Sequence, residues 1–150
     1  MNVTDFSSLA PGAKRVIVVG CGGLGSVLAA SLAEAGHRVR VMDRLTKALD
    51  ALPPGPVSDG LITPLLGDGT SEADLLGASI RDVDLLIAVT GSDATNAMAA
   101  QMAQHLFDVP VAMCRLDEPS KRALYGDLGL VAVSATELAV EAVMASTRGE

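Results

Sequence analysis

Three glycines near the amino end of the chain have the spacing of a phosphate-binding turn. Gly20, Gly22 and Gly25 form the pattern G-x-G-x-x-G directly after the β-branched run of residues 16–19. The first glycine allows a tight turn out of a strand, the second leaves room for a pyrophosphate, and the third lets a helix pack closely on the strand. Free N–H groups and the partial positive charge at the start of that helix would bind the phosphates. The pattern therefore predicts a nucleotide site built largely from backbone groups.

An acidic residue follows where a sugar-binding group is expected. Residues 38–43 predict a second strand that ends at Asp43, about 20 residues beyond the glycine turn. A carboxylate at this position accepts hydrogen bonds from ribose hydroxyls and repels a 2′-phosphate. The residues therefore favour NAD or an adenosine nucleotide over NADP. A glycine-rich turn without a ligand is the alternative, but strand, turn, helix, second strand and terminal acid all occur in register.

Three further positions follow predicted strands and have two interpretations each. Asp68 either caps the helix that begins near residue 71 or lies beside the adenine. Thr90 and Gly91, followed by Ser92, either open a helix as an ordinary N-cap or border the second ribose or phosphate. Arg115 ends an apolar run, so its charge must find an anion, which is either a nearby carboxylate or the nucleotide.

The sequence places no group as a catalytic acid or base. His37 follows the predicted end of the first helix and is expected to be solvated, and His105 is expected in the core or at an interface. Lys121 and Tyr125 are in the wrong order for a Tyr-x-x-x-Lys reductase. We therefore predict no catalytic residue. The N-terminal half of a small NAD-dependent dehydrogenase or reductase is the enzyme alternative.

Composition argues against several classes of ligand. The net charge is −7 and aromatic residues make up only 2% of the chain, so neither a basic face nor base-stacking side chains for nucleic acid are predicted. Cys21 and Cys114 belong to no metal-binding pattern, which favours two buried thiols in a reducing cytoplasm. Every apolar run is shorter than the roughly 20 residues that span a bilayer. We expect no metal, no direct membrane insertion and no signal peptide.

The rest of the chain alternates strands and helices around these residues. The predicted strands cover residues 15–20, 38–43, 61–66, 83–90, 109–116 and 130–133. The predicted helices cover residues 23–35, 45–52, 71–78, a stretch from 92, 119–127 and 136–144, and 53–60 is expected to be a surface loop. This alternation predicts an α/β, Rossmann-type doubly wound parallel sheet, with six strands in the order 3-2-1-4-5-6. Residues 1–13 are expected to be a flexible lead-in and residues 14–150 a single domain.

Periodicity predicts which helix faces cover the sheet. The apolar series of the first helix is Leu24, Val27, Leu28, Ser31, Leu32 and Ala35. The series of the helix that starts at residue 92 is Ala94, Ala97, Met98, Gln101, Met102, His105 and Leu106. Met98, Met102 and Met113 are accordingly expected in the core.

Five blocks of sequence resemble a known family. They are VIVVGCGGLGSVLAASLAEAGHRVRVMDR (16–44), GDGT (67–70), DLLIAVTGSDATN (84–96), MCRLDEP (113–119) and VSATELA (133–139). In this order and spacing they are similar to the TrkA-N, or RCK N-terminal, domain of potassium transport and channel regulators, over nearly all of residues 14–145. The block after the fourth strand and the block that opens the last helix are more specific than the glycine pattern alone.

The resemblance implies a regulatory function rather than a catalytic one. Such domains are cytoplasmic, peripheral to the inner face of the cell membrane. They pair as homodimers or build rings, and they act on an integral-membrane potassium transporter or channel when ligand exchange shifts the ring between conformations. Asn96 and the helix face that starts near residue 92 are implied to lie near the dimer contact.

The resemblance also implies the ligand and its contacts. Family members bind NAD(H), ATP or ADP; here NAD(H) is favoured, with ATP, ADP or AMP as alternatives. The implied cofactor-binding residues are Gly20, Cys21, Gly22, Gly23, Leu24, Gly25, Asp43, Arg44, Asp68, Gly69, Thr90, Gly91 and Arg115.

Two departures from the family pattern bear on the ligand and on the extent of the chain. Gly23 stands where family members often have a basic or long polar residue, which removes a terminal-phosphate contact and disfavours ATP. The C-terminal ligand-binding subdomain of full-length members is expected to be absent, either in a fragment or in a short stand-alone regulator. A structural assembly domain with an empty site is a further alternative, in which saturating nucleotide would not raise the melting temperature.

Overall fold

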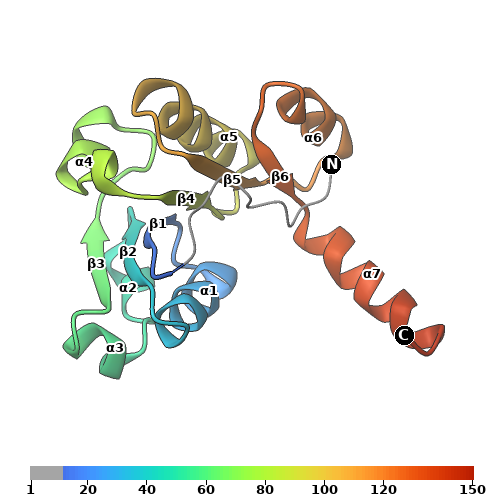
Figure 1. Cartoon of the computed structure of the whole chain (residues 1–150), viewed down its shortest axis with the longest axis horizontal. Helices are drawn as coiled ribbons and strands as arrows, with labels where there is room; N and C mark the ends of the chain where they lie inside the picture. The colour runs from blue at the N-terminus through green and yellow to red at the C-terminus, as the bar shows by residue number, and fades with distance from the viewer. Residues whose placement is uncertain (1–11) are drawn as a thin grey trace.

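The computed structural model describes residues 12–150, whose strands form one parallel sheet (Figure 1). The strands are β1 (Arg15–Val19), β2 (Arg38–Asp43), β3 (Ile62–Leu66), β4 (Leu85–Ala88), β5 (Val111–Arg115) and β6 (Val131–Val133). They lie in the order β3-β2-β1-β4-β5-β6, and every neighbouring pair is parallel. The predicted strand order is therefore confirmed. Of the predicted lead-in, residues 1–11 lie outside the described residues.

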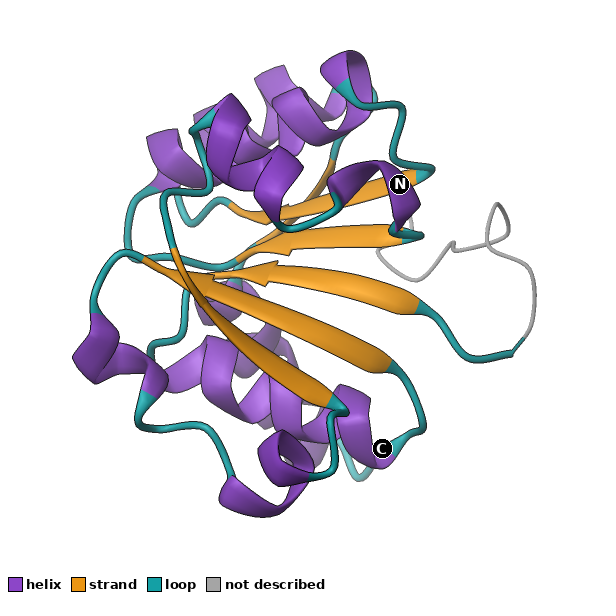
Figure 2. Cartoon of the chain, turned by 90° about the vertical axis from the view of Figure 1, so that its left-hand side faces the viewer, coloured by secondary structure: helices purple, strands orange, loops and turns teal. Residues whose placement is uncertain are grey.

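Helices cover both faces of the sheet (Figure 2). They are α1 (Gly23–Glu34), α2 (Thr46–Leu49), α3 (Pro54–Ser58), α4 (Glu72–Gly77), η1 (Ile80–Asp82), α5 (Asp93–Gln101), η2 (Met102–Leu106), α6 (Pro119–Gly126) and α7 (Ala135–Thr147). The prediction that residues 53–60 form a loop is wrong, because this segment contains α3. Pro54 is the first residue of α3, where its fixed φ suits a helix and no hydrogen bond is lost.

The strands direct alternate side chains into two aliphatic cores. Ile17 and Met42 belong to the core that packs against α4 and α5, whereas Val16 and Val41 belong to the core beneath α1. This burial on both faces is typical of parallel strands covered by helices.

Helix α1 buries only part of the face that periodicity predicts, since Leu28 and Leu32 are partly buried and pack against the core. Leu24 and Val27 are 41% and 63% exposed, and the buried residues of the helix are instead Gly25, Ala29 and Ala33. These three recur every four residues and form a stripe with little or no side chain. Such a stripe lets the helix axis approach the sheet, so closeness of packing decides the buried face rather than side-chain size.

Helix α5 differs from its prediction for the same reason. Its buried apolar residues are alanines, among them Ala97 and Ala100, whereas Met98 is 51% exposed. His105 lies in the π-helical turn η2 and is exposed, so neither residue belongs to the core. Met102 and Met113 are partly buried and pack against the two cores, as expected.

The last helix projects from the body of the molecule (Figure 1). Helix α7 is longer than predicted, and none of its side chains is buried by the described residues. Its exposed large apolar residues are Leu138, Val140, Val143 and Met144. No helix within residues 12–150 combines the length and the apolar character needed to cross a membrane.

Candidate nucleotide-binding site

A cavity of about 540 Å³ opens at the carboxyl ends of β1, β2, β3 and β4. Because β1 lies between β2 and β4, this is the point where the chain order reverses across the sheet. Ligands of open α/β sheets bind at such a switch point. The lining residues are Val19, Gly20, Met42, Asp43, Arg44, Leu45, Gly67, Asp68, Gly69, Thr90, Gly91, Ser92 and Thr95. Of the predicted site residues, the structure thus brings together Gly20, Asp43, Arg44, Asp68, Gly69, Thr90 and Gly91.

The glycine turn has the backbone geometry that its sequence predicts. Gly20 has a φ of +105°, and a Cβ there would lie 3.0 Å from the backbone nitrogen of Thr90. A Cβ at Gly22 or Gly23 would meet no atom within 4 Å. Gly22 is the N-cap of α1, and no described side chain caps this helix. The N–H groups of its first turn are therefore open to an anion.

Gly25 sits behind this turn rather than in the cavity lining. A Cβ at Gly25 would lie 1.8 Å from the carbonyl oxygen of Gly20. The role predicted for Gly25, close packing of the helix on the strand, therefore fits the geometry. Cys21 is buried and Leu24 is 41% exposed, and neither lines the cavity. Burial, together with the nearby Asp43 carboxylate, raises the pKa of the Cys21 thiol, so the thiol stays protonated.

Asp43 connects the end of β2 to the glycine turn. Its Oδ2 accepts the backbone N–H of Cys21 at 2.9 Å, and its Oδ1 accepts the N–H of Leu45 at 2.9 Å. Sequence reasoning assigned Asp43 only to the ribose and missed this structural role. Each carboxylate oxygen has a further lone pair for a hydroxyl group, so the two roles are compatible.

Asp68 closes the turn after β3 and does not cap α4. Its Oδ1 accepts the N–H of Thr70 at 2.8 Å and the Thr70 hydroxyl at 2.7 Å. These two hydrogen bonds favour the charged carboxylate and lower the pKa of Asp68. The N-cap of α4 is Ser71, whose hydroxyl accepts the N–H of Asp74. The capping interpretation of Asp68 is therefore wrong. Ser71 directly precedes the first residue of α4 and caps it, whereas the Asp68 carboxylate binds Thr70 in the preceding turn.

Gly69 is required by the proximity of this turn to β1. A Cβ at Gly69 would lie 2.3 Å from Cγ1 of Val19. The two acidic residues Asp43 and Asp68 are consequently held at neighbouring walls of the same cavity. Arg44 is the cation of this lining, and its charge also lowers the pKa of Asp68.

Thr90 forms the cavity wall after β4 and is held by a buried amide. Its N–H and its hydroxyl both donate to Oδ1 of Asn96, at 2.8 and 2.6 Å. The Asn96 amide in turn donates to the carbonyl oxygens of Thr90 and Arg115. Asn96 is 0% exposed, and its side chain fastens β4 to β5 within the chain. The dimer contact near this helix face remains a prediction.

The start of α5 contributes Ser92, which the sequence offered for this wall, and Thr95, which it did not. Ser92 and Thr95 both line the cavity, and the Ser92 hydroxyl accepts the N–H of Thr95 as an N-cap. The N-cap interpretation of this segment is confirmed. Ser92 thus both caps α5 and lines the cavity.

Arg115 lies outside the cavity lining and pairs with a carboxylate. Its Nη2 is 2.9 Å from Oδ2 of Asp117, and its Nε donates to the same oxygen at 3.0 Å. Of the two predicted partners for Arg115, a nearby carboxylate or the nucleotide, the structure shows the carboxylate. Any contact of Arg115 with a nucleotide remains a prediction.

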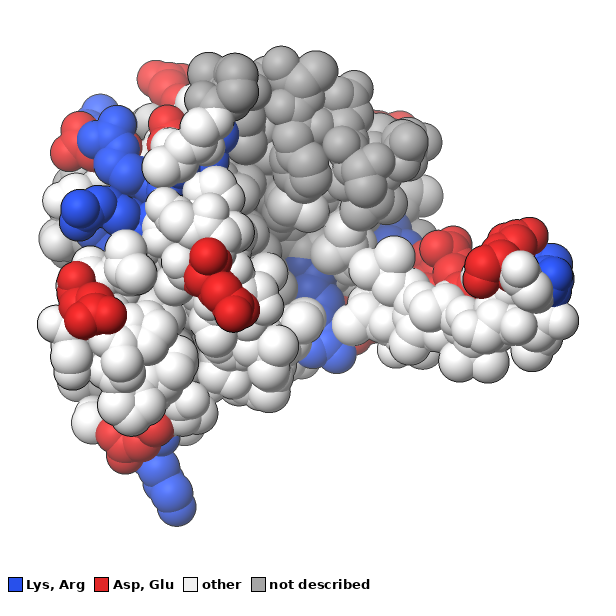
Figure 3. All heavy atoms as spheres, turned by 60° about the horizontal axis from the view of Figure 1, so that its bottom comes forward, with Lys and Arg blue, Asp and Glu red and all other residues white. Residues whose placement is uncertain are grey.

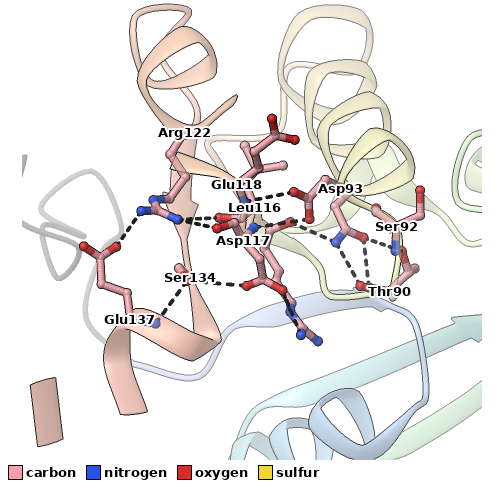
Figure 4. A network of polar contacts seen from close by, with 11 residues as sticks. Thr90, Ser92, Asp93, Leu116, Asp117, Glu118, Arg122, Ser134 and Glu137 are labelled. Atoms are coloured by element: carbon pink, nitrogen blue, oxygen red, sulfur yellow. Dashed lines mark hydrogen bonds and ion pairs between the residues drawn. The ribbon is translucent and has the colours of Figure 1, made fainter. Parts of the chain in front are cut away.

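Figure 4 shows the polar network around Asp117, which sequence reasoning did not find. Asp93, on the first turn of α5, accepts the N–H groups of Asp117 and Glu118 at 3.2 Å each. The Ser134 hydroxyl donates to Asp117 at 3.5 Å and caps α7 by accepting the N–H of Glu137. The network therefore joins the start of α5, beside the cavity, to the start of α7.

Asp117→Asn is expected to make unfolding less sensitive to acid. Hydrogen bonding from Arg115 is the main cause that lowers the pKa of Asp117. A carboxyl group whose pKa is lower in the folded state stabilises the fold above its unfolded pKa of about 3.9, and this stability is lost as the pH falls. The substitution should therefore cost more stability at pH 7 than at pH 3, measured by urea unfolding.

The control for this measurement is Asp50→Asn, because Asp50 is exposed on the carboxyl end of α2 and its side chain makes no hydrogen bond to the described residues. Equal losses for the Asp117 variant at both pH values would contradict the expectation.

The matching family model is that of the TrkA-N domain, over residues 16–136. The chain is 31% identical over 120 residues to the Trk system potassium uptake protein TrkA of Streptomyces coelicolor, covering 80% of this chain and 52% of that protein. It is 26% identical to the TrkA homolog of Pyrococcus abyssi, covering 75% of this chain and 48% of that protein. The chain thus spans about half the length of the curated relatives it matches.

Solved structures share the fold. The TrkA-N domain of the inner membrane protein ybaL from Escherichia coli has a TM-score of 0.74 at 15% identity, covering 90% of this chain and 97% of that one. The Kef CTD of Shewanella denitrificans in AMP-bound form has a TM-score of 0.67 at 20% identity, covering 87% and 80%. The GsuK channel bound to NAD has a TM-score of 0.65 at 16% identity, covering 85% and 22%.

The family model spans the glycine turn, the acid that ends β2, the Thr90–Asn96 pair and the Ser134 cap. These are the residues that build the cavity and its supporting network. This chain belongs to the TrkA-N domain family.

Proposed function

We propose that this chain is the nucleotide-sensing domain of a potassium uptake system or channel. The observation that carries the proposal is the cavity at the switch point, which is lined by Gly20 and by the Asp43 carboxylate. The uncapped start of α1 at Gly22 follows Gly20 by two residues, although Gly22 and Gly23 are not part of the cavity lining. Phosphates would bind the N–H groups at the start of α1, and the ribose hydroxyls would bind Asp43. Relatives named TrkA and structures solved with NAD or AMP support the ligand class.

In this proposal the domain acts without catalysis, on the cytoplasmic side of a membrane potassium transporter or channel. NAD(H) is the favoured ligand, with ATP, ADP or AMP as alternatives. A homodimer or ring would transmit the ligand state, since a ligand shifts an equilibrium by its different affinity for two arrangements. The exposed apolar side chains of α7 support assembly with a further chain, because contiguous exposed apolar surface marks contact sites.

The test is a thermal shift series with NAD, NADH, ATP, ADP and AMP at saturating concentration. A ligand that binds only the folded state must raise the melting temperature. Unchanged melting temperatures for all five nucleotides would contradict the proposal and favour a structural domain. Steady oxidation or reduction of the nicotinamide with small metabolites would favour the dehydrogenase alternative.

Asp43→Ala is expected to weaken nucleotide binding by about 1–3 kcal/mol, because a charge-assisted hydrogen bond to the ribose is lost. Titration calorimetry with the ligand of largest thermal shift measures this loss. Asp43 also holds the N–H groups of Cys21 and Leu45, so urea unfolding of the same variant must be measured to separate binding from stability. Asp50→Ala is the control, and unchanged affinity in the Asp43 variant would remove Asp43 from the site.

A further inference from the structure

Three arginines gather at the amino ends of the strands, opposite the nucleotide cavity. Arg15 at the start of β1 is paired in register with Arg38 at the start of β2, and Arg40 follows two residues along β2. With Gly60, Leu61 and Thr63 they line a separate cavity of about 90 Å³. We name Arg15, Arg38 and Arg40 the arginine cluster. Figure 3 shows Lys and Arg side chains at the upper left of the face that it presents, with Asp and Glu side chains among them.

The guanidinium groups of the arginine cluster form no ion pair with a carboxylate of residues 12–150, although the Asp84 carboxylate lies beside the backbone of Arg15. The whole chain carries 18 acidic and 11 basic residues. Yet within residues 12–150 none of the four ion pairs includes Arg15, Arg38 or Arg40. The guanidinium of Arg40 donates to the carbonyl oxygen of Ala78 at 3.2 Å, and Asp84 accepts only the backbone N–H of Arg15 at 2.8 Å.

Like charges at paired strand positions repel and cost stability. An anion bound among the guanidinium groups would relieve this repulsion. Arginine presents a planar fork of donors that matches phosphate oxygens, and Thr63 adds a hydroxyl group to the same cavity. At about 90 Å³ this cavity is much smaller than the nucleotide cavity of about 540 Å³, so a small anion suits it better than a whole nucleotide.

We propose that the arginine cluster binds a phosphate-class dianion at a site separate from the nucleotide cavity. The dianion has two sources with the same chemistry, namely free phosphate and the phosphomonoester head group of an anionic lipid. The site does not depend on the proposed nucleotide function, because its residues and those of the nucleotide cavity lie at opposite ends of the strands.

The test is a titration of the ¹⁵N-labelled chain with inorganic phosphate, with sodium chloride keeping the ionic strength constant. Saturable shifts are expected at the Leu61 and Thr63 amides and at the arginine Nε resonances. In Arg38→Gln/Arg40→Gln the affinity should fall at least tenfold. The control Lys47→Gln/Arg148→Gln removes the same charge from exposed positions elsewhere and should bind as the wild type does.

Three results would overturn the proposal: shifts equal to those caused by chloride, shifts confined to residues 20–25, or wild-type binding in the double arginine variant. The wild-type titration decides the matter even if that variant does not fold. Cosedimentation with phosphatidic acid vesicles, against phosphatidylcholine vesicles, distinguishes the sources. If the protein sediments with phosphatidic acid vesicles and this depends on Arg38 and Arg40, the ligand is the lipid head group. If phosphate binds saturably but the protein does not sediment with the vesicles, the ligand is the free ion.

Discussion

Gly25→Ala is expected to lower the free energy of unfolding by about 3 kcal/mol, since overpacking against fixed backbone costs 1–3 kcal/mol or more. The added Cβ would lie 1.8 Å from the Gly20 carbonyl oxygen and 2.8 Å from its carbon. Both are backbone atoms of the turn that starts the site, so neither can swing aside as a flexible side chain would. The clash can be avoided only if α1 moves away from β1, and this movement would loosen the packing of Ala29 and Ala33 against the core.

Urea unfolding measures this loss, and Gly23→Ala provides the matched control two residues earlier. A Cβ at Gly23 meets no atom within 4 Å, and alanine favours a helix, so the control should change stability by less than about 1 kcal/mol. Equal free energies of unfolding for the two variants would show that Gly25 is not needed for the close approach of α1 to the sheet.

Gly22→Val is expected to abolish nucleotide binding while the fold survives. The φ of Gly22 is −79°, so its backbone is extended and not left-handed, and its Cβ position is open. The side chain would occupy the space through which a pyrophosphate reaches the N–H groups at the start of α1. We expect a loss of affinity of roughly 100-fold or more, equivalent to about 2.7 kcal/mol.

Calorimetric titration with the preferred nucleotide measures this loss, with Gly22→Ala as an intermediate substitution. A graded loss from glycine to alanine to valine, at unchanged melting temperature of the free protein, would locate the phosphates at this turn. Wild-type affinity in the valine variant would place the phosphates elsewhere, even if Asp43 still contributed to binding. The two glycine variants thus separate packing at Gly25 from ligand access at Gly22.

The features that sequence predicted correctly depend on near neighbours in the chain. The β-branched run before Gly20, the interval to Asp43 and the alternation of strands and helices suffice for the strand order, because right-handed crossovers leave few topologies. The N-cap role of Ser92 also follows from residues within one helical turn. The positive φ of Gly20 follows from its place at the end of a strand that must turn sharply.

Packing overruled the sequence pattern where several helix faces were apolar. In α1, residues of similar hydropathy occur on more than one side, and the stripe of Gly25, Ala29 and Ala33 is buried because it admits the closest approach. The exposed Met98 of α5 has the same cause. A hydrophobic period identifies a helix, but the distance between helix and sheet decides which side faces inward.

The wound sheet, the glycine turn and the acid at the end of β2 can be predicted from the amino-acid pattern, because each depends on residues close together in the chain. Which distant residues meet becomes visible only in the folded chain. Strand register sets Arg15 beside Arg38, and the ends of β4 and β5 bring Asn96 to the carbonyl of Arg115. The physical reason is that hydrogen bonds and charge pairs act over a few ångströms, and that separation between distant segments is fixed by the packed core alone.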